Sequence, residues 1–133
     1  MVVAPPRFVP KALMRRPAEF GQDPEAEWRA ARNLTEASLM AHAYWQHLAA
    51  CVINERLRDS GASRKELAQA LGVGTRMLGS KLNGTFPAAS DELFRWALAF
   101  NDVSILPPPV NRVADVLPKA RGKHSYKRLG LHF

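Results

Sequence analysis

Apolar positions recur at helical spacing between residues 63 and 84 and predict two short helices joined by a tight turn. Ser63 and Glu66 have the spacing of a capping box, in which each side chain accepts a hydrogen bond from a backbone N–H at the start of a helix. Gly72 follows the last apolar position, where a left-handed residue ends a helix without strain. The first helix is therefore very short, and its apolar positions are Leu67, Ala68 and Leu71.

A second helix is predicted to begin near Gly74 or Thr75 and to run to Asn83, with Gly84 as its stop. At about 100° per residue, its apolar and polar side chains lie on opposite faces. Two short helices with a tight turn form a helix-turn-helix, whose second helix can enter the major groove of DNA. The apolar face carries Leu78 and Leu82, and the polar face carries Arg76 and Ser80 with Asn83 at its edge.

Two helical segments are expected upstream of this pair. Asp23, Pro24 and Glu25 predict a helix start, because an acid at the N-cap, a proline at the first position and a second acid all favour a helix N-terminus. We expect Trp28 to anchor that helix. A longer helix follows from about residue 36 to residue 59.

The helix at 36–59 has more apolar surface than it needs to pack on the helix pair. Leu48, Val52 and Leu57 suffice for that packing. The excess surface either folds against the Trp28 helix or pairs two chains, as a twofold-symmetric operator requires, and we favour a homodimer. The excess positions are Leu39, Met40, Tyr44 and Trp45.

A further helix is predicted from about residue 90 to residue 101, with acidic residues at its positive end and an apolar face. The preceding loop is expected to place Phe86 against the core. Pro107 to Pro109 closes the compact domain, and residues 110–117 form a brief apolar turn.

From Ile53 to Pro109, somewhat under half of the chain, the sequence resembles the phage-repressor, or xenobiotic-response-element, family of Cro-like helix-turn-helix domains. The stretch KLNGTFPAASDELFRWALAF resembles the variant in which Leu-x-Gly ends the recognition helix and an Asp-Glu-Leu helix follows. Gly74 stands where the family usually has Ser or Thr, and Gly79 lies inside the recognition helix. The family's pattern of Leu-Ala, three residues, Gly-Val and a later aliphatic residue matches Leu67, Ala68, Gly72, Val73 and Leu78.

The resemblance implies an all-α fold, a compact helical bundle that contains a lambda-repressor-like helix-turn-helix. We add an N-terminal helical extension and flexible basic ends. The expected parts are a basic proline-rich arm at 1–22, the helical extension and first domain helix at 23–59, the remainder of the helix-turn-helix domain at 60–109, and a basic tail at 110–133.

The net charge of +7 resides in the two ends of the 133-residue chain, since all twelve carboxylates lie between residues 17 and 118. Such basic ends are suited to contact with phosphates. A solvated tail is the alternative at each end, and for the N-terminal arm so is packing on a partner. The accessory basic residues are Arg7, Lys11, Arg15 and Arg16 in the arm, and Lys119, Arg121, Lys123, Lys127 and Arg128 in the tail.

Composition narrows the classes of protein further. The lone Cys51 lies in an apolar helix and is best explained as a buried, inert thiol. The four histidines have no metal-ligand spacing, so we expect neither a metal nor a cofactor. No segment is apolar enough for a membrane span or a secretory signal, which favours a cytoplasmic, nucleoid-associated protein.

Sequence-specific binding of double-stranded DNA, by a transcriptional regulator acting as a homodimer, is the leading hypothesis. Its recognition helix at 74–83 would lie in the major groove. Arginine can pair with guanine and asparagine with adenine, whereas basic residues at the flanks bind phosphates and fix orientation. The candidates are Thr75, Arg76, Ser80 and Asn83 for base edges, and Arg64, Lys65 and Lys81 for phosphates.

Two alternatives remain open. One is an architectural protein of weak sequence preference that binds through its basic ends, with steep salt dependence. The other is a protein-interaction module, such as an antitoxin or an adaptor, which would bind no DNA. An enzyme is not expected, because no catalytic arrangement or phosphate-binding glycine loop stands out, and Asp91 and Glu92 are explained by a helix start.

Overall fold

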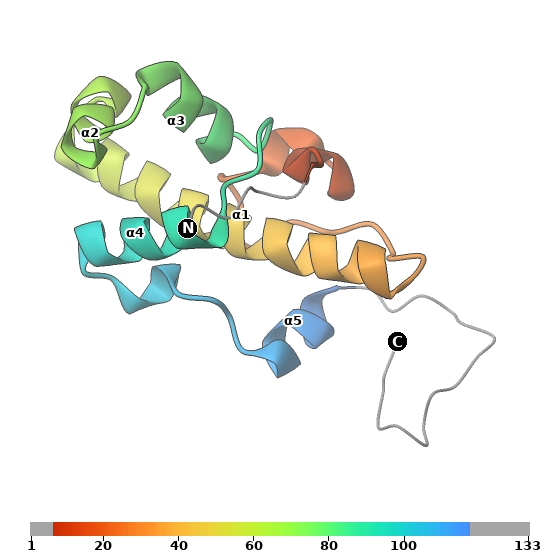
Figure 1. Cartoon of the computed structure of the whole chain (residues 1–133). Helices are drawn as coiled ribbons and strands as arrows, with labels where there is room; N and C mark the ends of the chain where they lie inside the picture. The colour runs from red at the N-terminus through yellow and green to blue at the C-terminus, as the bar shows by residue number, and fades with distance from the viewer. Residues whose placement is uncertain (1–6, 118–133) are drawn as a thin grey trace.

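The computed structural model describes residues 7–117, which are mostly helical and contain no β-strand (Figure 1). No helix in this range is long and apolar enough to cross a membrane. The elements in order are the 3₁₀ helices η1 (Pro10–Leu13) and η2 (Pro17–Glu19), the helices α1 (Leu34–Ser60), α2 (Arg64–Leu71), α3 (Thr75–Leu82) and α4 (Ser90–Phe100), the 3₁₀ helix η3 (Val103–Ile105) and the helix α5 (Val110–Val116).

Helix α1 is the element on which the others pack. Its N-cap is Asn33, whose side chain accepts a hydrogen bond from the Glu36 backbone at 2.8 Å, and it ends at Gly61 in a left-handed conformation. In Figure 1, α2 and α3 lie on one side of α1, and α4 and η3 lie on the other. The long helix predicted at about 36–59 is thus confirmed with slightly wider bounds.

Buried polar side chains of α1 bind the loop that follows α3. The amide of Gln46 donates to the carbonyls of Lys81 at 2.8 Å and Phe86 at 3.0 Å, and it accepts from the backbone N–H of Ala88 at 2.8 Å. His42 donates to the Ala88 carbonyl. Because a buried backbone group without a partner is costly, these bonds fix the end of α3 and the start of α4 relative to α1.

The helix predicted from Asp23 is absent, and this expectation was wrong. The Asp23 carboxylate accepts from the N–H of Glu25 at 2.9 Å and closes a turn of only two residues. The chain then runs extended, so that Trp28 forms an isolated antiparallel bridge with Met14. Trp28 is 1% exposed, and its ring meets Tyr44 edge to face. Burial of Trp28 by this distant pairing outweighs the local signals for a helix.

Residues 10–22 do not form a free arm, because they fold onto α1 and onto the end of α3. Phe20 is buried, and the backbone N–H of Lys11 donates to the Gly84 carbonyl at 3.0 Å. Gly21 has φ of 72°, and a Cβ atom there would lie 2.5 Å from the Leu82 carbonyl oxygen. The contact is therefore too close for any other residue.

The excess apolar surface of α1 is covered by the chain itself. Tyr44 packs on Trp28, and Trp45, which is 8% exposed, donates from its indole to the Ile105 carbonyl at 2.7 Å. Met40 is fully buried. Three of the four excess positions are therefore buried within the chain and Leu39 is half-buried, so intrachain packing is the alternative that the structure supports for this surface.

The segment after α3 departs from expectation at Phe86, which is 45% exposed and does not pack in the core. Gln46 binds the Phe86 carbonyl, and the buried positions of the loop are taken by Pro87, Ala88 and Ala89. Helix α4 forms as predicted and ends at Asn101 in a left-handed conformation.

The segment after the three prolines contains a short helix. Residues 110–116 form α5, in which no residue is buried, and Leu117 is buried at its end. The domain boundary expected at residue 109 stays a prediction.

His47 is buried and neutral. Its Nδ1 atom accepts from the N–H of Gly21 at 2.9 Å, and its Nε2–H donates to the Asp23 carbonyl at 2.8 Å. Burial lowers the pKa of His47 below 6.5, and this outweighs the Asp23 carbonyl and the nearby carboxylates of Asp23 and Glu19, which raise it. Burial also raises the pKa of the Cys51 thiol to about 12, as expected for an inert core group.

Acid should destabilise the fold through His47. The unfolded chain binds a proton near pH 6.5, whereas the folded chain resists it, so stability is full above this pH and falls as the pH drops toward the lowered folded pKa. The expected slope is up to about 1.4 kcal/mol per pH unit. Urea unfolding between pH 7.5 and 5 measures it, and His47→Gln should flatten the curve. An equally steep curve in this variant would contradict the assignment.

Candidate nucleic-acid interface

Helices α2 and α3 form from the local signals of the sequence. The Ser63 hydroxyl accepts from the N–H of Glu66 at 3.1 Å, and the Glu66 carboxylate accepts from the N–H of Ser63 at 3.2 Å, which completes the capping box. Gly72 ends α2 with φ of 70°. Ala68 and Leu78 are buried where α2 packs on α3. The bounds predicted for both helices are confirmed.

The outer face of α3 carries the residues predicted to read bases. Arg76, Ser80 and Asn83 recur at i, i+4 and i+7 and so lie along one face, and Thr75 lies at the helix start. The hydroxyl of Ser80 donates to the Arg76 carbonyl at 3.1 Å, and Asn83 accepts from the N–H of Thr85 at 3.0 Å. Asn83 retains its two amide donors, whereas the Ser80 hydroxyl donates within the helix.

Arg76 is the strongest donor on this face. Its side chain is exposed and forms no hydrogen bond or ion pair with another residue in the range 7–117. A guanidinium has five N–H donors in a planar fork that matches the acceptors of guanine. The face therefore presents one free bidentate donor group and one amide.

Lys81 does not belong to this face. Its side chain is 13% exposed and forms an ion pair with Glu92 of α4. Glu92 also accepts from the backbone N–H of Ala89 at 3.2 Å, which caps α4. The pair joins α3 to α4 inside the bundle, so we no longer assign Lys81 to phosphate contact. Arg64 and Lys65, the other two candidates, are exposed at the start of α2.

Replacing Lys81 with methionine should lower the free energy of unfolding by about 1–2 kcal/mol. The change leaves the partly buried carboxylate of Glu92 without its partner, and partial solvation reduces the cost below that of a fully buried pair. Urea unfolding measures the loss, and the double variant Lys81→Met with Glu92→Gln should recover part of it. A Lys81→Met protein of unchanged stability would contradict this role.

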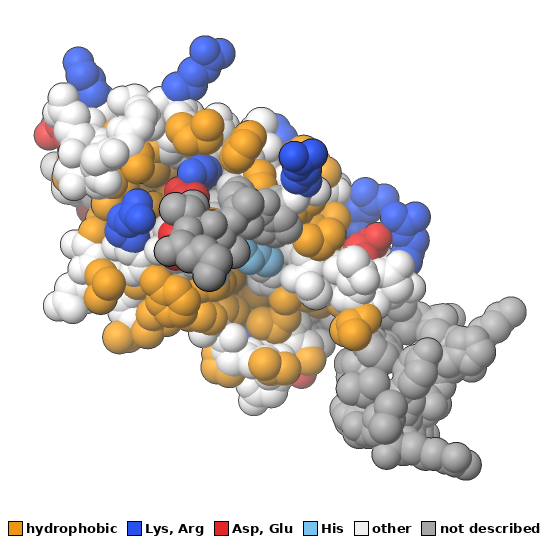
Figure 2. All heavy atoms as spheres, viewed as in Figure 1, with side chains coloured by type: hydrophobic (Ala, Val, Ile, Leu, Met, Phe, Trp, Pro, Cys, Tyr) orange, Lys and Arg blue, Asp and Glu red, His pale blue; other side chains and the backbone are white. Residues whose placement is uncertain are grey.

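Positive charge gathers on the surface of α2 and α3. Figure 2 shows Lys and Arg side chains projecting from the top of the molecule, where Figure 1 places these two helices. Outside the Lys81–Glu92 pair, residues 63–84 contain three basic residues, Arg64, Lys65 and Arg76, and a single acid, Glu66. The charge of this part of the described surface is therefore suited to contact with a polyanion.

The basic residues of the N-terminal part are distributed differently. Arg15 lies 3.9 Å from Glu27, and Arg16 lies 3.3 Å from Glu19. Arg7 is exposed. Residues 10–22 pack on the bundle, so these side chains belong to its surface and not to an extended arm. The five basic residues of the tail, Lys119, Arg121, Lys123, Lys127 and Arg128, lie outside the described residues.

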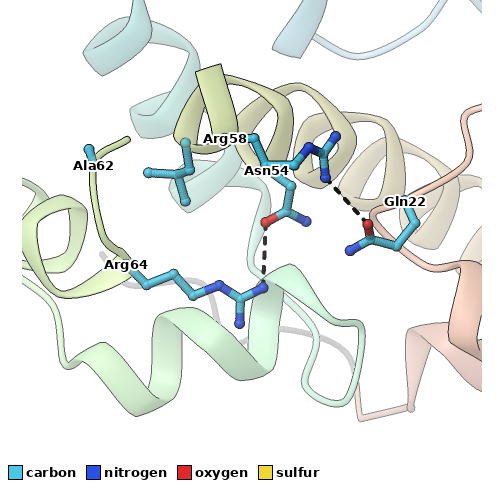
Figure 3. Close-up of a pocket in the computed structure, with 6 residues that line it drawn as sticks. Gln22, Asn54, Arg58, Ala62 and Arg64 are labelled. Carbon is cyan, nitrogen blue, oxygen red and sulfur yellow. Dashed lines mark hydrogen bonds between the residues drawn. The ribbon is translucent and has the colours of Figure 1, made fainter. Parts of the chain in front are cut away.

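One group of polar residues was missed by sequence reasoning. Arg58 and Arg64 face a cleft of about 270 Å³ between α1, α2 and the N-terminal segment, and Gln22 faces it from that segment (Figure 3). Gln22 is 36 residues from Arg58, so no local spacing relates them. A Cβ atom at Gly79 would lie 3.4 Å from an Arg64 nitrogen, which is an ordinary contact, so the Arg64 side chain passes beside this mid-helix glycine.

No family model, curated protein or solved structure matches this chain.

Proposed function

We propose that this protein binds double-stranded DNA and reads its sequence with α3 in the major groove, as a transcriptional regulator. The observation that carries the proposal is the line of Arg76, Ser80 and Asn83 along α3, in which Arg76 and Asn83 are exposed, Ser80 is half-buried, and Arg76 has no partner within the described range. An α-helix with its side chains is about 10–12 Å in diameter, which fits the width of the major groove.

The support of α3 is consistent with this role. Gln46 binds the carbonyl of Lys81, the Lys81–Glu92 pair joins α3 to α4, and Gly21 lies against the Leu82 carbonyl. A reading surface held from behind keeps its geometry on binding, which lowers the entropic cost of association.

The phosphate contacts of the proposal come from α2. Arg64 and Lys65 are exposed at its N-terminus, where the helix dipole also favours an anion. With α3 in the groove, α2 would cross the backbone and fix the orientation. The arrangement of α2, a three-residue turn and α3 supports the expected lambda-repressor-like bundle as part of this proposal.

We propose a homodimer that forms through a surface other than the apolar face of α1 expected from the sequence. We define the α4–η3 face as four exposed apolar residues on two contacting elements that lie across α1 from the proposed DNA surface; these are Phe94 and Leu98 on α4, Val103 on η3 and Leu106 directly after η3. Hydrophobic side chains gather over this part of the molecule (Figure 2). In a twofold interface a patch meets its own copy, and four uncharged residues can do so without repulsion.

Leu98→Glu should therefore make the protein monomeric. Leu98 is 82% exposed, so the change costs the monomer little, whereas a dimer would place two carboxylates at its interface. Light scattering measures the mass, with Leu34→Glu, an exposed leucine at the start of α1, as the matched control. A wild-type protein that is already monomeric at 100-fold the concentration used for DNA binding would contradict the dimer.

Weakly specific architectural binding is the second candidate. It is favoured by Ser80, whose hydroxyl donates to the Arg76 carbonyl, and by the absence of a side-chain cap at Gly74, since both reduce the chemistry available for reading bases. The exposed α4–η3 face favours the third, a protein-interaction module that binds no DNA.

One experiment separates the three. Purified protein is incubated with fragmented genomic DNA near physiological salt, and the bound fragments are recovered and sequenced. A few recovered sites that share an inverted repeat support the sequence-specific dimer. Uniform recovery supports the architectural protein, and recovery of no DNA contradicts both and supports the interaction module.

A further inference from the structure

The cleft beside α2 brings together donors from three parts of the chain. Arg58 comes from the last turn of α1, Arg64 begins α2, and Gln22 belongs to the N-terminal segment (Figure 3). The floor includes Asn54, which is 5% exposed and donates to the Gly21 carbonyl at 2.9 Å. The floor of the cleft is therefore a packed part of the fold, whereas Gln22, Arg58 and Arg64 line it as exposed side chains.

Both guanidinium groups are poorly satisfied by the protein. Arg64 donates to the Asn54 carbonyl oxygen at 3.5 Å, and Arg58 donates to that of Gln22, also at 3.5 Å. These are long bonds, one for each group of five donors. Neither arginine forms an ion pair within residues 7–117, although five other basic residues there do.

The lining has the composition of an anion site. It contains two arginines, two amides and the apolar side chains of Leu57 and Ala62, and no carboxylate. The Gln22 amide bound to Arg58 orients its own N–H₂ group as a further donor. Forked guanidinium groups match the tetrahedral oxygens of phosphate. The volume of about 270 Å³ is slightly below the usual range of drug-sized pockets, which suits a small anion.

We propose that Arg58, Arg64 and Gln22 bind one phosphate group in this cleft. The group is either inorganic phosphate and small phosphate esters in solution or a phosphate of the DNA backbone. Binding of free phosphate does not depend on the proposed function. Binding of a DNA backbone phosphate rests on the proposed function and extends it, because Arg58 and Gln22 would join the phosphate contacts of α2.

The residues that line the cleft also contact the surroundings of α3, so a bound anion would strengthen the support of this helix. Arg64 passes against Gly79, and Asn54 holds Gly21 against the Leu82 carbonyl. An anion that draws the two arginines together would therefore tie α1, α2 and the N-terminal segment around α3. Free phosphate should raise the thermal stability of the protein.

The first arm of the test uses the full-length protein and inorganic phosphate without DNA. Phosphate is added against chloride at equal ionic strength, and the melting temperature is followed. We expect a rise of about 5 °C at ten times the dissociation constant. Arg58→Gln should abolish most of the rise, and Arg95→Gln, which removes the same charge from exposed α4, should keep it. The side-chain N–H resonances of Arg58 and Arg64 should shift in the wild-type protein.

The second arm measures binding to a DNA fragment in chloride as a function of salt. If the cleft takes a backbone phosphate, Arg58→Gln weakens binding and reduces the slope of log K against log salt by about one. Loss of the phosphate response with unchanged DNA binding assigns the site to the free anion. No effect of Arg58→Gln in either arm overturns the proposal. If the wild-type protein binds no DNA, the proposed function fails and the first arm alone decides the cleft.

Discussion

Replacing Gly21 with alanine is expected to lower the free energy of unfolding by about 3–5 kcal/mol, a large share of the stability of a small domain. Two costs combine. The left-handed backbone at φ of 72° costs an L-residue about 1–2 kcal/mol. The added Cβ would also lie 2.5 Å from the Leu82 carbonyl oxygen and 3.0 Å from the Asn54 amide nitrogen, so the backbone of the N-terminal segment must move away from α3.

Gly61→Ala is the matched control for this prediction. Gly61 has nearly the same φ, 71°, but a Cβ atom there meets nothing within 4 Å. Its substitution should cost only the backbone strain, about 1–2 kcal/mol. Urea unfolding of both variants isolates the contact between the N-terminal segment and α3. Equal losses in the two variants would show that residues 20–22 do not press on α3 in solution.

Four glycines show which parts of the fold can be predicted from the sequence. Gly61 and Gly72 act locally, since each ends the helix directly before it, and the helices around them were predicted within a few residues. Gly21 and Gly84 are required by contacts with Leu82 and Phe20, which are 61 and 64 residues away. Local spacing contains no signal for such contacts.

The wrong helix at Asp23 has the same cause. Its start signals are real, because the Asp23 carboxylate does accept a backbone hydrogen bond, but the turn closes on Glu25 and stops. What decides the conformation of the next residues is the burial of Trp28 against Tyr44, together with the bridge to Met14. Propensity is a weak determinant where a tryptophan can be buried by non-local pairing.

The candidate interface likewise contains residues that helical spacing predicts and residues that it does not. Arg76, Ser80 and Asn83 were placed on one face by helical spacing alone, and the structure exposes Arg76 and Asn83 with half-buried Ser80 between them. Lys81 was expected at the flank of the same helix as a phosphate contact, yet it pairs with Glu92 on the next helix. The cleft required three separate elements to meet, so only the folded chain reveals it.

Arg76→Ala is expected to weaken binding to a selected DNA site about 5- to 150-fold, the value of one bidentate base contact. Its side chain has no partner in the described part of the protein, so the fold should be unaffected. Binding is measured by fluorescence anisotropy on a site recovered from genomic DNA. Arg95→Ala, which removes an exposed arginine from α4, is the control and should bind as the wild type does.

The dependence of the affinity loss on DNA sequence distinguishes a base contact from a phosphate contact. Substitution of a residue that reads a base should weaken binding to the selected site strongly and binding to an unrelated fragment much less. The ratio of the two affinities therefore decreases. Lys65→Ala, by contrast, should weaken both fragments alike and lower the salt slope by about one, because a phosphate contact carries no sequence information. If Arg76→Ala behaves as Lys65→Ala does, α3 binds DNA through charge alone, and the architectural function replaces the sequence-specific one.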